Sequence, residues 1–599
     1  MARLPWRAAL GVTLAAALAL SGCAAGREPH GGGSGTPKTG GTVRFAMPPS
    51  ATPNWIMPFS IPGYSGSYNG MIRSTMYVPL YSYDASSGSV TLDDAASAAN
   101  APSYSPDGKT VTITLKPLTW STGEPMTSRD VEFWLNLARA GKDNWSKYSK
   151  GLIPDSITGF RAVDDRTFTF TLDKAYNPDW FTANQLSLIV PMPHAWDRTS
   201  AAGPVGDHDR TPGGAKKVFD FLVSQAKQLG TYATNPLWRV GNGPFTLAGF
   251  TTSGEVTLRK NPKYTGPDPA KIDTVRFLTF TSSSAEYNVL RAGGVDYGYL
   301  PTSNLGQRSK LEQQGYRVEP WNGWSITYSP YNFNNPKLGK VFSQLYVRQA
   351  IQHAVDQDAI TSVIWRGAAR VGYGPVPQDN DTKYLSPKQK TNPYPFDLDK
   401  SRQLFADHGW KPGSDGVLLC ADPAKCGEGI AQGTRLSLTM LTESGSDETD
   451  GTMQELRSEL SKVGIEMKIN AQPLNTVLAN GTTCEAKDPS CSWQLSYFGT
   501  QGSWYFSANP SGEELFATGA GTNFGGYTDP KADKLIAATN LASDNGAMLE
   551  YSAYLAEQLP VLWLPNPPYQ VSAIDTALHG VSQDPLAGQL LPQRWFWTR

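Results

Sequence analysis

The chain has 599 residues, in which 52 Lys and Arg face 53 Asp and Glu for a formal net charge of −1 at pH 7. Because the basic residues are interspersed among acidic ones, the sequence carries no electrostatic footprint for nucleic acid. This length leaves room for several domains of about 100–200 residues each.

The first residues, MARLPWRAALGVTLAAALALSGC, have the layout of a secretory signal peptide. Arg3 and Arg7 precede an apolar run of about 13 residues and a small-residue site, and that run is too short for a permanent membrane span. Its ending, LSGC, resembles the bacterial lipobox, in which the cysteine is acylated and becomes the new N-terminus. We expect residues 1–22 to be the signal peptide and Cys23 the lipid anchor, with a plain signal peptide as the alternative.

The segment after Cys23, AAGREPHGGGSGTPKTGG, consists of Gly, Ser, Pro and charged residues with few apolar ones. Such a composition buries too little surface to order itself, so residues 23–41 are predicted to be a flexible tether. No later stretch approaches 18 apolar residues, and no second membrane span is predicted.

The body of the chain alternates strand and helix signals, which indicates an α/β fold. Residues 110–115 (TVTITL) and 167–172 (TFTFTL) alternate apolar and polar positions and are predicted strands. Residues 126–140 and 346–360 carry apolar stripes at helical spacing, and Thr127 with Asp130 resembles a capping box. The expected core stripes are Val131, Trp134, Leu135 and Ala138 in the first helix, and Val347, Ala350, Ile351, Ala354 and Val355 in the second.

The remaining cysteines form two close pairs, Cys420 with Cys426 and Cys484 with Cys491. In an exported chain such pairs favour two local disulfides, although four cysteines allow three connectivities. A zinc site is the rival, but these spacings are wider than usual for paired ligands and His408 is the only histidine nearby.

Enzyme motifs are sparse. Residues 224–227, 543–545 and 38–40 each match one element of the serine β-lactamase set, but their order is wrong and the last lies in the tether. The sequence lacks a G-x-S-x-G elbow, an H-E-x-x-H motif and a phosphate-binding P-loop. We predict no catalytic residue, cofactor or metal. A secreted hydrolase stays the alternative, because the catalytic carboxylate pair of a glycoside hydrolase is defined by its spacing in the folded protein and not in the sequence.

Several stretches in order, among them SPDGKTVTITLKPLTWSTGEPMTSRDVEFWL, GNGPFTLAGF, LRAGGVDYGYLP, YVRQAIQHAVDQDAI and LPVLWLPN, together resemble one family. They are similar to the family 5 extracytoplasmic solute-binding proteins, the oligopeptide, dipeptide and nickel receptors of ABC importers. The resemblance covers nearly the whole chain after the tether.

The resemblance implies a periplasmic-binding-protein type II-like fold, with two α/β lobes, a hinge and an inserted third domain (cluster C). Transferred to this chain, it places lobe I at 42–76, 237–323 and 560–599, the inserted domain at 77–236 and lobe II at 324–559. The hinge crossings are expected near 321–335 and 559–569.

The resemblance also implies a monomeric, lipid-anchored receptor on the extracytoplasmic face of the cell membrane. It would capture oligopeptides or related solutes between its lobes and deliver them to permease subunits. Because the chain has no P-loop, the ATPase must be a separate subunit. A lipid-anchored enzyme or signalling module on the same scaffold is the other class.

One stretch of the chain departs from the pattern of the family that it resembles, and this departure concerns ligand specificity. Family peptide receptors carry an aspartate in lobe II that pairs with the peptide's α-ammonium group, with an arginine a few residues earlier. The corresponding stretch, SWQLSYFGTQGSWYFSANPSGEELF, has no Asp, Arg or Lys between Ser492 and Pro510, and Glu513 or Glu514 could substitute only with a shifted alignment.

This stretch instead offers aromatic and small polar side chains, which suit blocked peptides or oligosaccharides. A nickel chelate is disfavoured because the histidines are scattered. The candidate ligand-binding residues are Tyr64, Trp324, Tyr328, Trp493, Tyr497, Phe498, Trp504 and Tyr505, and each could equally belong to the core.

Overall fold

The computed structural model describes residues 36–87, 90–378, 383–488, 491–586 and 589–598. The predicted signal peptide and Cys23 therefore lie outside the described residues. Among the described residues, no helix has the length and apolar character needed to cross a membrane.

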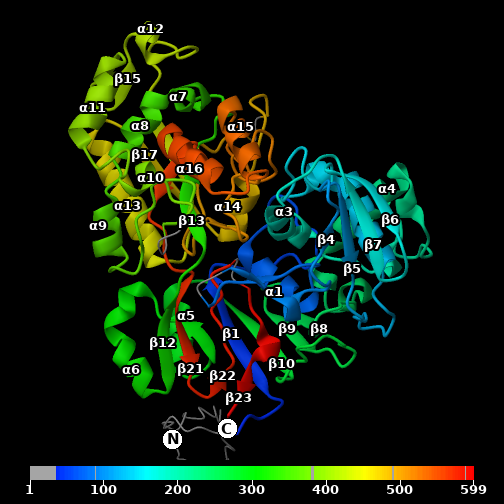
Figure 1. The fold of residues 1–599 in the computed structure, drawn as a ribbon. Helices are drawn as coiled ribbons and strands as arrows, with labels where there is room; N and C mark the ends of the chain where they lie inside the picture. Colours follow the sequence, from blue (N-terminus) through cyan, green and yellow to red (C-terminus); the bar gives the residue numbers. More distant parts are fainter. Residues whose placement is uncertain (1–35, 88–89, 379–382, 489–490, 587–588, 599) are drawn as a thin grey trace, which may run out of the picture.

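The largest sheet, which we call the lobe I sheet, lies at the bottom of the view in Figure 1 and contains the first strand of the chain. Its strand order is β12-β21-β11-β1-β10-β9-β8. Strand β1 runs parallel to β10 and β11, whereas the other neighbours are antiparallel. The strands are β1 (Thr42–Pro49), β8 (Phe245–Phe250), β9 (Val256–Lys260), β10 (Thr274–Phe280), β11 (Tyr297–Tyr299), β12 (Tyr316–Trp321) and β21 (Gln570–Asp575).

Helices cover the lobe I sheet. Helix α5 (Ser283–Arg291) contacts β1, β10 and β11, α6 (Arg308–Gln313) contacts β12, and α1 (Ser67–Met76) contacts β8. Both faces of β1 are largely buried, which explains its nearly continuous apolar run.

A second unit, at the right in Figure 1, is built on the antiparallel sheet β4-β5-β7-β6. Its strands β5 and β7 coincide with the predicted alternating segments, and the apolar side chains of each are buried while the threonines are more accessible. The elements are β2 (Tyr83–Asp84), β3 (Thr91–Leu92), β4 (Ser103–Tyr104), β5 (Thr110–Thr114), β6 (Ile157–Ala162), β7 (Thr167–Leu172), α2 (Ser128–Gly141), α3 (Pro178–Asn184) and α4 (Pro212–Ala226).

The predicted capping box is present at the start of α2. The Asp130 carboxylate accepts a hydrogen bond from the Thr127 backbone N–H at 2.7 Å. The predicted stripe of this helix is buried and packs against α4, so local sequence and tertiary packing agree here.

The upper unit in Figure 1 contains two further sheets, parallel β17-β16-β18 and antiparallel β19-β13-β20. Its main strands are β13 (Ser325–Pro330), β16 (Ser437–Glu443), β17 (Glu466–Gln472), β18 (Leu495–Tyr497), β19 (Trp504–Tyr505) and β20 (Val561–Leu564). Its helices are α7 (Gly339–Ser343), α8 (Leu345–His353), α9 (Gln357–Ala359), α10 (Pro387–Lys390), α11 (Leu398–Asp407), α12 (Pro423–Cys426), α13 (Asp447–Lys462), α14 (Leu474–Asn480), α15 (Pro530–Thr539) and α16 (Gly546–Gln558). Its short strand pair is β14 (Trp410–Pro412) with β15 (Leu418–Cys420). The pair of β22 (Leu578–His579) with β23 (Phe596–Trp597) lies in the lower unit instead (Figure 1).

The second predicted helix is shorter than its apolar stripe. Helix α8 ends at His353, and a new turn starts at α9, where the Asp356 carboxylate accepts from the Ala359 N–H at 2.8 Å. All five stripe residues are nevertheless buried. The side-chain pattern thus continues through a break in the backbone helix.

The chain passes between the lower and upper units at two places. Residues 322–324 join β12 to β13, and residues 565–569 join β20 to β21. Because β20 pairs with β13, residues 561–564 belong to an upper sheet, whereas the sequence predicts that lobe I resumes at residue 560. The crossings themselves lie within the segments expected to form the hinge.

Candidate functional site

A cavity of about 250 Å³ lies between the upper unit on one side and the lower and right-hand units on the other. Small-molecule pockets typically measure about 300–1,000 Å³, so this one suits a compact solute. Its lining residues are Ser60, Ser65, Gly66, Ser67, Tyr68, Gly70, Arg73, Ser146, Lys147, Tyr328, Leu474, Leu478, Phe498, Gln501, Gly502, Ser503, Trp504, Tyr505, Thr522 and Phe524.

Helix α1 supplies one wall. The Asn69 side-chain oxygen accepts hydrogen bonds from the backbone N–H groups of Asn54 and Trp55 at 3.0 and 3.2 Å, and this fixes the helix to the segment after β1. At Gly66 a Cβ atom would lie 2.4 Å from the Tyr68 ring, so only glycine lets that ring stay in the wall.

A turn of the upper unit supplies the opposite wall. Gly502 adopts a φ of +95°, which favours glycine, and the Ser503 N–H donates to the Ile326 carbonyl at 2.9 Å. Strand β19 then pairs with β13 and places Trp504 and Tyr505 on the cavity. Phe498, which directly follows β18, completes an aromatic surface.

The structure brings half of the predicted site residues together. Tyr328, Phe498, Trp504 and Tyr505 line the cavity, and Tyr328 contacts the Phe498 ring edge to face at 5.9 Å between centroids. This cluster comes from two segments about 170 residues apart in the sequence, joined through the pairing of β13 with β19.

The other four predicted residues are not among the described lining residues. Tyr64 packs on Trp55 with centroids 4.8 Å apart, and Trp324 is partly buried against the core around β13. Tyr497 is 1% exposed on β18. Trp493 is 6% exposed and donates its indole N–H to the Thr482 carbonyl at 3.0 Å. Trp493 and Tyr497 are therefore buried, whereas Tyr64 and Trp324 are only partly buried at the edges of core clusters, and a ligand contact by any of the four stays a prediction.

Sequence reasoning missed the part of the wall that comes from outside the upper unit. Tyr68 and Arg73 lie on α1, and Lys147 follows helix α2 in the right-hand unit. No motif or periodicity marks these residues, because each reaches the cavity only through the packing of separate units.

Charges at the cavity are unevenly compensated. The Lys147 ammonium pairs with the Glu514 carboxylate at 2.7 Å and lies 4.1 Å above the Trp504 ring. Burial raises the pKa of Glu514, and Lys147 acts in the opposite direction. The described lining contains two cationic side chains, those of Arg73 and Lys147, and no Asp or Glu.

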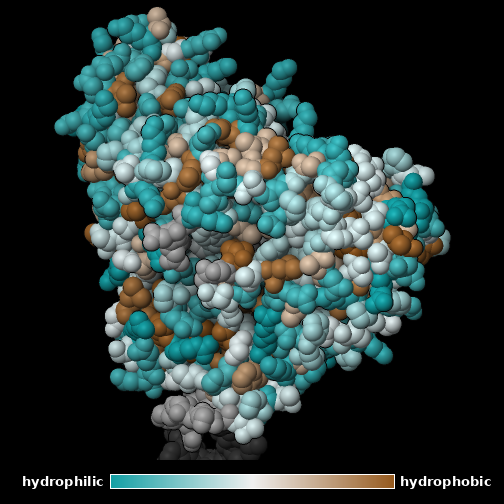
Figure 2. Space-filling model, viewed as in Figure 1, coloured by the Kyte–Doolittle hydropathy of each residue, from teal (hydrophilic) through white to brown (hydrophobic). Residues whose placement is uncertain are grey.

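The upper unit is held against the other two. The Trp180 indole donates to the Ser511 hydroxyl at 3.0 Å, the Asn475 amide donates to the Thr52 carbonyl at 2.8 Å, and the Thr302 hydroxyl donates to Glu448 at 2.6 Å. These bonds join the upper unit to each of the other two. On the face in Figure 2, scattered hydrophobic groups include one near the centre, where the three units meet.

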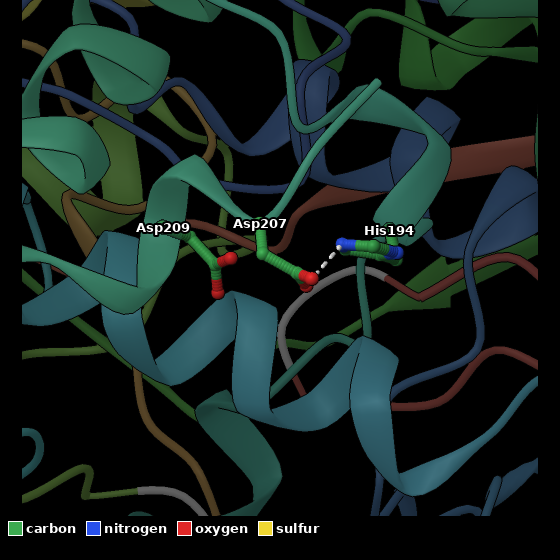
Figure 3. Close-up of side chains that lie close together, drawn as sticks. All are labelled: His194, Asp207 and Asp209. Atoms are coloured by element: carbon green, nitrogen blue, oxygen red, sulfur yellow. Dashed lines mark ion pairs between the residues drawn. The ribbon is translucent and has the colours of Figure 1, made fainter.

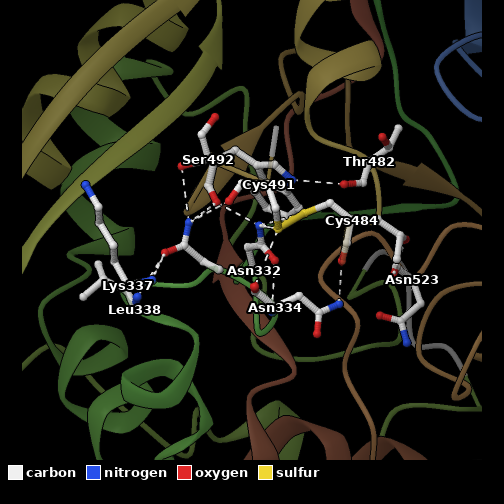
Figure 4. The surroundings of a disulfide bond; sticks show 12 residues. Asn332, Asn334, Lys337, Leu338, Thr482, Cys484, Cys491, Ser492 and Asn523 are labelled. Atoms are coloured by element: carbon white, nitrogen blue, oxygen red, sulfur yellow. Dashed lines mark hydrogen bonds between the residues drawn. A yellow bond between two sulfur atoms is a disulfide. The ribbon is translucent and has the colours of Figure 1, made fainter. Parts of the chain in front are cut away.

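Both cysteine pairs form local disulfides, Cys420 with Cys426 and Cys484 with Cys491. The second is held against the segment after β13 (Figure 4): Asn334 donates to the Cys484 carbonyl at 2.9 Å, and Asn332 donates to the Trp493 carbonyl at 2.8 Å. His408, the rival zinc ligand, stacks on the Tyr346 ring at 3.7 Å.

His194, Asp207 and Asp209 lie close together in the right-hand unit (Figure 3), within reach of a common cation. The Arg129 guanidinium already occupies this position, donating to Asp209 at 2.9 Å and to Asp207 at 3.0 Å. Since Arg129 pairs with both carboxylates and Arg210 also pairs with Asp207 at 3.3 Å, the cluster is an ion-pair network between α2 and the loop before α4.

Residues 95–523 match the sequence profile of the bacterial extracellular solute-binding proteins, family 5 Middle. The chain belongs to this family. Its members are binding receptors, so this protein is a solute-binding protein and not an enzyme. The expected family and fold class are thereby confirmed.

Similar curated proteins include Protein XP55 of Streptomyces lividans, 26% identical over 75% of this chain and 71% of that protein. Oligopeptide-binding protein OppA of Lactococcus lactis is 24% identical over 72% of this chain and 68% of its own length. A putative ABC transporter peptide-binding protein of Brucella ovis is 26% identical over 58% of this chain, and the match spans 59% of that relative.

Solved structures of the family share the fold. AppA of Bacillus subtilis, in complex with a nonapeptide, superposes with a TM-score of 0.74 at 19% identity, covering 94% of this chain and 100% of that one. AgaA of Agrobacterium tumefaciens, in complex with agropinic acid, gives a TM-score of 0.68 at 19% identity, covering 92% and 96%. At these identities the likeness establishes the fold alone.

Proposed function

We propose that the protein is the solute receptor of an ABC importer and captures its ligand in the cavity between α1 and the β19 turn. The observation that carries this proposal is the lining itself, which combines walls from all three units with the aromatic surface of Phe498, Trp504 and Tyr505. A site assembled from separate units forms only when they close together.

Closure of the lobes around the solute would link solute binding to recognition of the receptor by the permease. The proposed division of the chain is lobe I at 42–76, 237–323 and 560–599, the inserted domain at 77–236 and lobe II at 324–559. Strand β20 (561–564) is the exception, because it pairs with β13 in an upper sheet. A solute that binds the closed form better than the open one shifts the population toward it by its differential affinity. The permease, with separate ATPase subunits, would then read the closed form of a monomeric receptor.

The proposed ligand is an oligopeptide or a related solute. The names of the Lactococcus and Brucella relatives support peptides. The lack of Asp and Glu in the described lining disfavours a free peptide N-terminus, since a buried ammonium group without a partner is costly. Aromatic faces beside Ser and Gln side chains keep an oligosaccharide as the second candidate.

The lipobox-like ending of the signal peptide supports a proposal about where in the cell the protein acts. We propose that Cys23 carries the lipid and holds the receptor on the extracytoplasmic face of the membrane, with residues 23–41 as its tether. The last residues of this segment are already fixed to the folded part, because the Lys38 and Gly40 N–H groups donate to the carbonyls of Trp597 and Lys271 at 2.8 and 2.7 Å. Two or more acyl chains give stable attachment where a single chain does not.

Small-angle X-ray scattering with a solute panel tests the proposal. We expect a peptide or related solute to decrease the radius of gyration of the purified protein and to change its tryptophan fluorescence. The matched control is Trp493→Phe, which removes an indole that does not itself line the cavity and should compact with solute like the wild type. Binding without compaction, or compaction retained when Trp504 and Tyr505 are both replaced by Ala, would contradict a ligand site between the lobes.

A further inference from the structure

The cation of Arg73 lies on the cavity without a counter-charge. Among the described residues, no ion pair or hydrogen bond is found for its guanidinium, and the buried Nη1 atom has no acceptor. The other cation of the lining differs, because Glu514 already compensates Lys147.

The groups around Arg73 do not supply a negative charge. Tyr77 and Tyr232 are the titratable groups that act electrostatically on Arg73, and burial raises the pKa of both phenols, so they stay neutral. Burial lowers the pKa of Arg73 itself to about 10, which leaves it protonated at neutral pH. The protein therefore keeps an uncompensated cation in its ligand cavity.

The space above this cation is open. Gly70 lies one helical turn before Arg73 and also lines the cavity. A Cβ atom at Gly70 would lie 4.0 Å from Nη2, so a larger side chain there would cover the guanidinium. Glycine in the interior of a helix is unfavourable, and here the absence of a side chain leaves the Nη2 side of the guanidinium uncovered.

We propose that Arg73 binds a carboxylate group of the captured solute, whose apolar part lies on Phe498, Trp504 and Tyr505. This inference rests on the proposed function and specifies its substrate class. A guanidinium pairs with a planar carboxylate through two parallel N–H···O bonds, which gives orientation as well as affinity. A cavity of about 250 Å³ suits a compact acid, such as a blocked short peptide with a free C-terminus.

Isothermal titration calorimetry with matched acids and amides tests the assignment. The probes are N-acetylated di- and tripeptides with aromatic side chains, each with a C-terminal carboxylate or the corresponding amide, and the protein is the full chain in detergent. For the acid probes that bind most tightly, we expect the wild-type protein to bind each acid at least about tenfold more tightly than its amide. In Arg73→Gln this preference should fall below threefold, and Arg73→Lys should keep part of it.

Two controls separate recognition from folding. Without ligand, Arg73→Gln should melt at or above the wild-type temperature because it removes an unpaired charge, whereas a structural arginine would lower the melting temperature and leave the acid preference intact. Lys147→Gln should weaken acids and amides alike, through the Trp504 contact.

The outcomes distinguish this inference from the proposed function. Equal binding of acids and amides, or binding of neutral solutes alone, overturns the carboxylate site and leaves the receptor function standing. An acid preference retained in Arg73→Gln also overturns it. If inorganic phosphate competes more strongly than acetate, the carboxylate assignment is wrong. If neither probe series nor a cell extract binds, both the inference and the receptor function fall.

Discussion

Trp504 and Trp493 stand only 11 positions apart, yet the structure gives them different environments. Trp504 lies on the cavity under the Lys147 ammonium, whereas Trp493 is buried in a small cluster with Leu441, Val477 and Phe524. From the sequence alone, both tryptophans are predicted ligand contacts and nothing distinguishes them.

Replacing Trp504 by Ala should weaken solute binding about tenfold or more, because it removes an aromatic face from the site. Trp493→Phe is the matched control: it leaves a void and an unpaired Thr482 carbonyl, so it should lower the free energy of unfolding by roughly 1–2 kcal/mol with little change in affinity. Calorimetry and chemical denaturation measure both quantities. Equal affinity losses in the two variants would contradict this division of roles.

At the residue scale, the sequence predicts aromatic ligand contacts but cannot predict their charged neighbours. Trp504 and Tyr505 of β19 stand out in the sequence because the aspartate and arginine of family peptide receptors are missing from that stretch. Arg73 and Lys147 belong to segments whose sequence carries no comparable signal, and their proximity is created by docking of α1 and the right-hand unit onto the upper one.

Among the elements, the loop before α15 carries a pH-sensitive contact. The Asn184 amide donates to the Glu513 carboxylate at 3.1 Å across the cleft, and the side chain of Glu513 is almost fully buried. Burial, and then the neighbouring charge of Glu514, raise the pKa of Glu513 from 4.5 to about 7.

Opening of the cleft would expose Glu513 and return its pKa toward the ordinary value. The closed form then binds a proton more tightly, so its relative stability is greatest below pH 4.5 and is lost as the pH rises to about 7. We expect solute affinity to be roughly tenfold higher at pH 5.5 than at pH 7.5, with the difference largely gone in Glu513→Gln. A pH dependence that persists in this variant would assign it to another group.

The disulfide between Cys484 and Cys491 stabilises the element that precedes Phe498. Replacing both cysteines by Ser should cost roughly 2–3 kcal/mol in unfolding free energy by loop entropy, and should weaken solute binding because the cavity wall loosens. The disulfide between Cys420 and Cys426 closes a loop of similar length far from the cavity, since its sequence separation is 6 and that of Cys484 and Cys491 is 7. The control is the double Ser variant at Cys420 and Cys426. It should lose stability without losing affinity, and a matching loss of affinity would contradict the local effect.

For the whole molecule, the fold is predicted by the order of the family-like sequence stretches along the chain, and no single predicted helix or strand would be enough. The strands at 110–115 and 167–172 and the capping box at Thr127 are local patterns that the structure confirms. The break of the second helix at Asp356 was missed, because its buried stripe continues across the interruption. The pairing of β20 with β13 is likewise set by tertiary contact.

The predicted lipid anchor is a property of the whole chain that is independent of the cleft. Cys23→Ser in the full chain should move the protein from the membrane fraction to the soluble fraction, with unchanged solute affinity, since a lipid group supplies the attachment. Cell fractionation and intact mass measure this, with Trp504→Ala as a variant that should stay membrane-bound. An unchanged membrane fraction and no loss of acyl mass would contradict the anchor.

Native mass spectrometry of the purified protein, before and after mild denaturation, tests most directly whether a solute is captured between the lobes. The account predicts that the wild type carries a small acidic solute, or takes one up from a cell extract, and releases it on denaturation. It also predicts that Trp504→Ala with Tyr505→Ala carries far less of it. An unoccupied wild type after exposure to the extract, or equal occupancy in the double variant, would contradict the central claim.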